Sequence, residues 1–184
     1  MKAEDSLVLV DMDQTAWGFE EAFIEAWQRR HPDLPFVPLQ ERRRFKIEDD
    51  YPDRHRALVR AIKLAPGFAL SMRPLPGAIE AVRQMSCGGL SVFFCTAALS
   101  NCPHNLSEKQ SVIERDCPEF AGRLIVTKDK TLVRGRWLFD DRPSVAGLMT
   151  PTWEHVVVGA PYNRHVTGRR RVRSLADWRE VTNR

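Results

Sequence analysis

The chain has 184 residues, of which 43% are hydrophobic and 28% charged, and its formal net charge is +4. This length supports one substantial core with a small lid, so we expect a single domain with an insertion. No apolar run is long enough to span a membrane and the N-terminus lacks a secretory signal, which predicts a soluble, cytoplasmic protein without membrane partners. The four cysteines lack metal-ligand spacing and are expected to be reduced and structural.

The first part of the chain predicts one buried strand followed by helices. Residues 7–10 are a continuous Leu and Val run, which is typical of a strand buried on both faces. Apolar side chains then recur at helical spacing over 19–27 and again over 55–63. Since no convincing strand occurs in this stretch, we assign residues 16–73 to a small helical cap over the carboxyl edge of a sheet.

The second part of the chain alternates strands and helices regularly. Pro76 and Gly77 open a helix, and a strand follows at 91–95. Ser107 with Gln110 resembles a capping box that begins the next helix. The remaining elements are strands at 124–126, 137–139 and 155–158 and a short helix at 175–181. Five strands in this rhythm predict an α/β doubly wound parallel sheet, built from residues 1–15 and 74–184.

Carboxylates and a hydroxyl follow three of the predicted strands. Asp11 and Asp13 end the first, Thr96 ends the second, and Asp140 and Asp141 end a later one. Because the carboxyl ends of parallel strands line a common crevice, we expect these side chains to meet there. Such a cluster repels itself unless a hard cation such as Mg²⁺ binds it. The pattern therefore predicts a metal-assisted phosphoryl transfer enzyme.

The residue types suit this chemistry, although each motif alone is weak. One of the two aspartates of the first motif could attack a phosphoryl group while the other handles protons. Lys109 could neutralise charge that develops on the phosphoryl group. A DxD pair is often only a turn or a cap, and it is the order of the motifs along the chain that makes the pattern specific.

These residues resemble the haloacid-dehalogenase-type phosphatases, whose four motifs are matched by Asp11-Met12-Asp13, Thr96, Lys109 and Asp140-Asp141. More narrowly, the chain resembles the 5′(3′)-deoxyribonucleotidase family over most of its length. The matching segments are residues 8–13, 42–43, 45, 75–78, 95–96, 108–109, 127–131, 140–143 and 153–155. The resemblance implies a Rossmannoid core with a small cap, and phosphomonoester hydrolysis as the activity.

The resemblance also implies a role for each matched residue. Asp11 becomes the nucleophile and Asp13 the general acid and base. Mg²⁺ would be held at the group formed by Asp11, the backbone carbonyl of Asp13, Asp140 and Asp141. The phosphoryl group would be held by Thr96, Lys109 and Lys128, and the walls of the substrate site would be formed by Phe19, Phe45, Lys46 and Phe68.

Several departures from the family keep other readings open. Gln14 replaces the usual glycine, Ala97 the usual serine, and Lys46 an aromatic residue. The preferred reading is hydrolysis of nucleoside monophosphates, with deoxyribonucleotides first. The rivals are hydrolysis of another small phosphate ester, such as a sugar phosphate, and a phosphate-ligand-binding protein with little turnover.

Two basic clusters, residues 42–44 and 169–173, raise nucleic acid as a distant alternative. Short basic runs are more often solvated surface, and no groove-reading motif accompanies them. The sequence leaves open whether the protein is a monomer or a homodimer.

Overall fold

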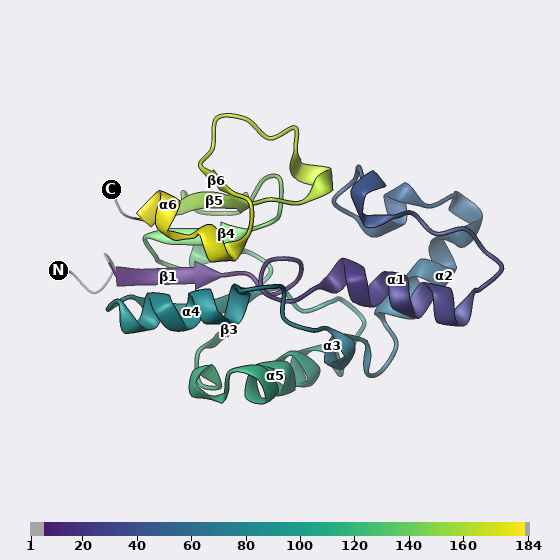
Figure 1. Ribbon diagram of the computed structural model, residues 1–184, viewed down its shortest axis with the longest axis horizontal. Coiled ribbons are helices and arrows are strands. Elements are labelled where there is room, and N and C mark those ends of the chain that lie inside the picture. Colours follow the sequence, from purple (N-terminus) through teal and green to yellow (C-terminus); the bar gives the residue numbers. More distant parts are fainter. Residues whose placement is uncertain (1–5, 183–184) are drawn as a thin grey trace.

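The computed structural model describes residues 6–182, which form an α/β fold around one sheet (Figure 1). Six strands lie in the order β3-β2-β1-β4-β5-β6, and every neighbouring pair is parallel. The strands are β1 (Leu7–Val10), β2 (Ser91–Thr96), β3 (Leu124–Val126), β4 (Trp137–Asp140), β5 (Glu154–Val158) and β6 (Arg171–Val172). The strand order reverses beside β1, where open α/β sheets place their ligands. The predicted α/β doubly wound parallel sheet is confirmed.

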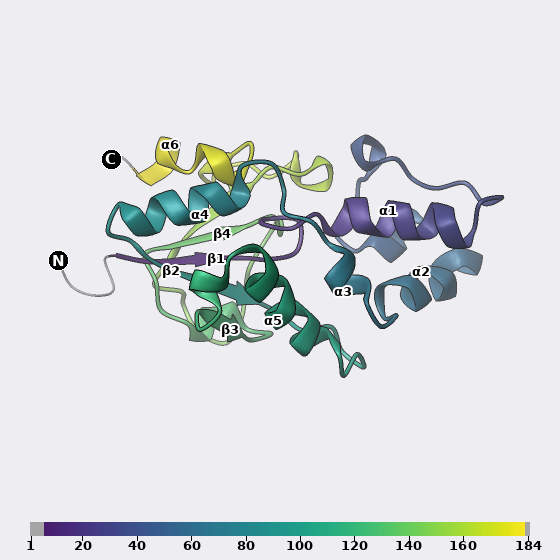
Figure 2. The ribbon, with the colours of Figure 1, turned by 60° about the horizontal axis from the view of Figure 1, so that its bottom comes forward.

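Both faces of the sheet are buried, as the apolar runs predicted. Val8 and Val10 of β1 belong to a large cluster that includes side chains of α4 (Ala78–Cys87) and α5 (Asn105–Asp116). Leu9 points the other way, because successive strand residues face opposite sides, and joins a smaller cluster with Trp153. The C-terminal elements η8 (Leu175–Asp177) and α6 (Arg179–Thr182) lie beside α4 (Figure 2).

A second group of helices lies at the end of the molecule opposite α6 (Figure 1). It comprises α1 (Phe19–Arg30), η2 (Leu39–Glu41), η3 (Ile47–Asp50), η4 (Asp53–His55), α2 (Arg56–Lys63) and α3 (Phe68–Ser71). Its centre is apolar, because Phe23, Trp27, Tyr51 and Ile62 are all buried there. These helices occupy the segment assigned to a cap, and the division of the chain at residues 15 and 73 stays a prediction.

Two local predictions were wrong. The sheet has a sixth strand, β6, which the sequence did not indicate because its two residues, Arg171 and Val172, are too few to form an apolar run. Backbone pairing builds it instead, with Val157 N donating to Arg170 O and Gly159 N to Val172 O, each at 2.9 Å. The predicted capping box also fails, since α5 begins at Asn105 and Ser107 already lies in its first turn, donating to His104 O.

Candidate active site

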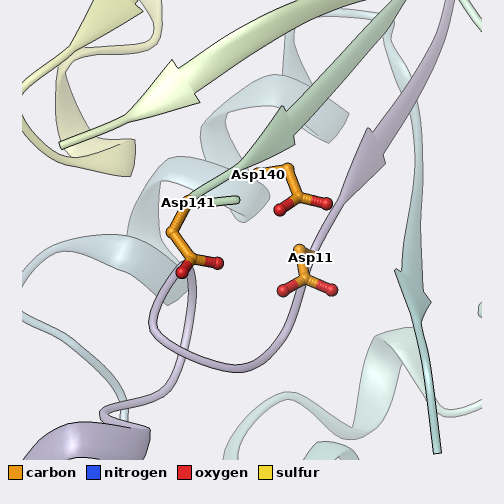
Figure 3. A group of neighbouring side chains, drawn as sticks. All are labelled: Asp11, Asp140 and Asp141. Atoms are coloured by element: carbon orange, nitrogen blue, oxygen red, sulfur yellow. The ribbon is translucent and has the colours of Figure 1, made fainter. Parts of the chain in front are cut away.

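Three aspartates meet at the carboxyl edge of the sheet (Figure 3). Asp11 follows β1, Asp140 ends β4, and Asp141 comes next. One carboxylate oxygen of each lies within 4.8 Å of the others, and all three residues are buried. β1 and β4 are direct neighbours in the sheet, which brings residues far apart in the sequence together. The expected convergence of Asp11, Asp140 and Asp141 therefore exists.

Lys130, on η6 (Lys130–Leu132), supplies the counter-charge of this cluster. Its Nζ donates to Asp11 Oδ1 at 2.5 Å and to Asp140 Oδ2 at 2.6 Å. Lys128, which was predicted to hold the phosphoryl group, donates to Ser100 Oγ and lines the cavity of the site, but forms no ion pair with the three aspartates among residues 6–182. The sequence alone does not show which of Lys128 and Lys130 reaches the aspartates, because this depends on how the loop after β3 turns.

Burial and mutual repulsion set the protonation behaviour of the cluster. Burial raises the pKa of Asp11 to about 6, although the nearby Lys130 ammonium lowers it. Burial and the charges of Asp140 and Asp11 hold the pKa of Asp141 well above its ordinary value. For Asp140, burial acts in the same direction, but Lys130 overcomes it and the pKa is lowered. The cluster thus combines one strongly acidic carboxyl with two that accept protons readily.

A second contact group joins the first three motifs. Lys109 on α5 is 1% exposed, and its Nζ donates to Asp13 Oδ2 at 2.9 Å and to Thr96 Oγ1 at 2.7 Å. Asp13 Oδ1 is also buried, yet no donor among residues 6–182 reaches it. A buried, unpartnered carboxylate oxygen costs free energy unless a ligand or a proton satisfies it. Asp13 is therefore held in place through one oxygen while the other is left available.

Three residues that were not predicted as site residues hold Asp141. Thr15 Oγ1 lies 3.4 Å from Asp141 Oδ1 and accepts a bond from the Asp141 backbone N–H at 3.1 Å. The Tyr162 hydroxyl, on η7 (Pro161–Asn163), donates to Asp141 Oδ2. Asn163 Nδ2 donates to the Asp141 carbonyl oxygen at 2.6 Å. No local pattern marked these residues, because each contact joins segments distant in the sequence.

The site opens into a cavity of about 600 Å³ between the sheet edge and the helices of residues 19–63. This volume lies within the range of small-molecule sites. Phe19, Phe45 and Lys46, three of the predicted substrate-binding residues, line it. Phe68 is not among the described residues that line it; it is buried against Phe19, with ring centroids 5.2 Å apart.

Gln14 and Ala97, the two departures near the motifs, both line the cavity. Gln14 has φ +54°, in the left-handed region that glycine enters most easily. Its Oε1 accepts a bond from Glu20 N at 2.8 Å, which links the Asp11–Asp13 loop to the first turn of α1. The Ala97 carbonyl accepts from Lys109 Nζ at 3.2 Å.

The arginines of both basic clusters have structural contacts. Buried Arg42 donates to both Glu20 carboxylate oxygens, at 2.6 and 2.9 Å, and also pairs with Asp50. In the C-terminal cluster, Arg170 pairs with Glu154 and donates to the Val181 carbonyl. Arg42 and Arg170 therefore have structural roles within the fold.

The donor set at the three aspartates fits a hard divalent cation. The three ligand atoms that the aspartates offer are carboxylate oxygens, which Mg²⁺ prefers, and their spacing is compatible with one shared ion. Asp13 lies outside this group through its side chain, which is engaged by Lys109, so its expected part in metal binding rests on its backbone carbonyl.

Comparison with solved structures identifies the fold as that of haloacid-dehalogenase-like hydrolases. A hydrolase of that family from Xanthomonas campestris has a TM-score of 0.55 at 14% identity, covering 98% of this chain and 95% of the other. D,D-heptose 1,7-bisphosphate phosphatase from B. bronchiseptica, complexed with magnesium and phosphate, has a TM-score of 0.52 at 11% identity, covering 95% and 96%. No helix among the described residues is long and apolar enough to cross a membrane.

Sequence comparison identifies the family. The family model of "5' nucleotidase, deoxy (Pyrimidine), cytosolic type C protein" matches residues 5–183. A Bordetella pertussis protein whose name includes 5′(3′)-deoxyribonucleotidase is 43% identical, covering 96% of this chain and 94% of its own. The human cytosolic-type 5′(3′)-deoxyribonucleotidase is 40% identical, covering 95% and 92%. The chain thus belongs to the 5′(3′)-deoxyribonucleotidase family and is a phosphomonoester hydrolase.

Proposed function

We propose that the protein hydrolyses nucleoside monophosphates, with deoxyribonucleotides as the favoured class, to nucleoside and orthophosphate, and that it uses Mg²⁺. The observation that carries this proposal is the meeting of two groups at one wall of the cavity. One group is the Asp11, Asp140 and Asp141 cluster, and the other is Asp13, which Lys109 contacts; all four aspartates line the cavity. The names of the relatives support the substrate, and the human relative's cytosolic type supports action in the cytoplasm.

In the first step, the Asp11 carboxylate attacks phosphorus and the bond from phosphorus to the ester oxygen breaks, leaving an aspartyl-phosphate. Asp13 gives its proton to the departing ester oxygen. Its Oδ1 suits this task because no described residue occupies it. Thr96 and Lys109 hold the phosphoryl oxygens, while bound Mg²⁺ would supply positive charge that reduces the repulsion between Asp11 and the ester.

In the second step, Asp13 takes a proton from a water molecule whose oxygen attacks phosphorus. The bond between phosphorus and the Asp11 oxygen breaks, which releases orthophosphate and restores the Asp11 carboxylate. Lys109 keeps Asp13 oriented in both steps through the 2.9 Å contact with Oδ2. Phe19 and Phe45 from the cap offer apolar surface to the nucleoside, while Lys46 and Lys128 add charge to the same cavity.

The test is phosphate release by the purified protein, with and without Mg²⁺, from deoxyribonucleoside and ribonucleoside monophosphates and from sugar phosphates. Asp11→Asn serves as the blank. We expect Mg²⁺-dependent release that is fastest from deoxyribonucleotides and is abolished in the variant. Release from sugar phosphates alone would move the substrate class, and no release from any ester would contradict the proposed function.

The role of Asp13 has its own test. In Asp13→Asn, turnover of a nucleotide, whose alkoxide is a poor leaving group, should fall far more than turnover of an activated aryl phosphate. The aryl leaving group needs little help from an acid, so the two losses should differ by about tenfold or more. Equal losses on both esters would remove Asp13 from the role of proton donor.

A further inference from the structure

The cap presents a row of cations to the cavity, on the side formed by α2 and η3. Arg56, Arg60 and Lys63 follow the i, i+4, i+7 spacing that places side chains on one face of a helix, and all three line the cavity. Lys46, at the start of η3, lines it as well. We call these four residues the basic wall. It is separate from Lys109 and Lys130, which contact the catalytic carboxylates.

Two members of the basic wall are already paired. Lys63 forms an ion pair with Glu48. The Arg56 guanidinium lies 3.0 Å from Asp53 and 3.5 Å from Asp49. These carboxylates neutralise their partners, so Arg56 and Lys63 hold the wall together and offer little free charge to a ligand.

The other two members have no carboxylate partner. Within residues 6–182, neither Lys46 nor Arg60 forms an ion pair or a side-chain hydrogen bond, although Arg60 lies close enough to Glu48 to lower the pKa of its carboxyl. Both side chains are exposed, and both line the cavity. In the proposed function the scissile phosphate binds at Asp11, where Lys109 and Lys130 already supply positive charge. The wall therefore offers positive charge that a substrate with a single phosphate leaves unmatched.

We propose that the basic wall selects substrates that carry a second anionic group, at the end remote from the scissile phosphate, and that Lys46 and Arg60 bind this group. The inference rests on the proposed function, since it places the scissile phosphate at Asp11. In chemical terms the substrate is a nucleotide whose base carries a carboxylate or another anion. A charge-assisted hydrogen bond to either cation would favour it over a neutral analogue.

The experiment compares two nucleotides of nearly equal shape, 5-carboxy-2′-deoxyuridine 5′-monophosphate and its neutral 5-carbamoyl counterpart. At neutral pH they differ by one negative charge on the base. We expect kcat/KM to be about tenfold higher for the carboxy compound, the usual effect of one hydrogen bond to a charged group. The preference should appear mainly in KM, because the added group lies far from the reacting atoms.

The double variant Lys46→Met with Arg60→Met should remove this preference while it still hydrolyses the carbamoyl compound. The matched control is Arg54→Met, which removes charge from an exposed cap residue that does not line the cavity. It should keep the full preference. Thermal melts of the variants with the wild type would show that the cap remains folded.

Each outcome decides the inference. A preference in the wild type and in Arg54→Met that disappears in the double variant supports binding by Lys46 and Arg60. Equal kcat/KM for both nucleotides in the wild type overturns the inference and leaves the proposed function intact. So does an equal loss on both nucleotides in the double variant, which would mean that the wall only attracts anions from solution. Phosphate release from neither nucleotide would overturn the proposed function, and this inference with it.

Discussion

Replacing Lys130 with methionine tests whether this ammonium and a divalent cation share one role. The Lys130 Nζ lies 2.5 Å from Asp11 and 2.6 Å from Asp140, and the side chain is only 9% exposed. Removing one partner of a buried ion pair typically costs about 3–5 kcal/mol. Asp11, whose pKa is already about 6, can take up a proton in the variant and relieve part of this cost. We therefore expect a loss near the lower limit, about 3 kcal/mol.

The assay is thermal unfolding, with and without Mg²⁺. For a chain of this size a loss of about 3 kcal/mol corresponds to roughly 6–12 °C in Tm. Mg²⁺ should recover much of this loss, because a cation bound to the three aspartates replaces the missing ammonium, and a ligand at 100 times its Kd stabilises by about 2.7 kcal/mol. The gain in Tm on adding Mg²⁺ should thus be larger in the variant than in the wild type.

The matched control is Lys128→Met, which removes an exposed lysine from the same loop. It should change stability by no more than about 0.5 kcal/mol. Two results would refute the reasoning. One is a similar small loss in Lys130→Met and Lys128→Met, which would mean that Lys130 does not balance the carboxylates. The other is a large loss in Lys130→Met that Mg²⁺ leaves unchanged, which would separate the lysine from the cation site.

Two further predictions concern stability. Burial opposes the ionised form of Asp116, but hydrogen bonds from Arg115 and Trp17 lower its pKa below the ordinary value of 3.8. The ionised carboxylate therefore stabilises the folded protein above that pH, and this stabilisation is lost as the pH falls through the folded-state pKa. Asp116→Asn should cost about 1 kcal/mol at neutral pH, and urea titrations should show the deficit shrinking towards pH 3; a constant deficit would contradict this. In Gly159→Ala the new Cβ would lie 2.9 Å from the Arg173 carbonyl oxygen, so the free energy of unfolding should fall by about 1–3 kcal/mol. The control is Gly122→Ala, whose Cβ meets nothing within 4 Å and which should be near neutral. Equal melting temperatures for the two variants would argue against close packing of β6.

The residues that end the strands were predictable because their signals are local. A continuous apolar run such as Leu7–Val10 needs burial on both faces, and a polar residue directly after it must lie at the carboxyl edge of the sheet. Asp11, Thr96 and Asp140 were placed by this argument alone, before any contact between them was known. The apolar spacing of α1 and α2 was equally local, which is why these two helices could be predicted.

The partners of those residues were decided by the tertiary structure. Lys130 reaches Asp11 across 119 positions, and Thr15 reaches Asp141 across 126, so no short window of sequence contains both members of either pair. The strand β6 likewise forms through backbone pairing with β5, and its two residues, Arg171 and Val172, are too few to form an apolar run. A charged side chain can form hydrogen bonds with water or with many different partners, whereas an apolar run is stabilised only by burial. The sequence by itself therefore determined the strands and the residues at their ends. The tertiary structure decided which cation and which hydroxyl groups contact those residues.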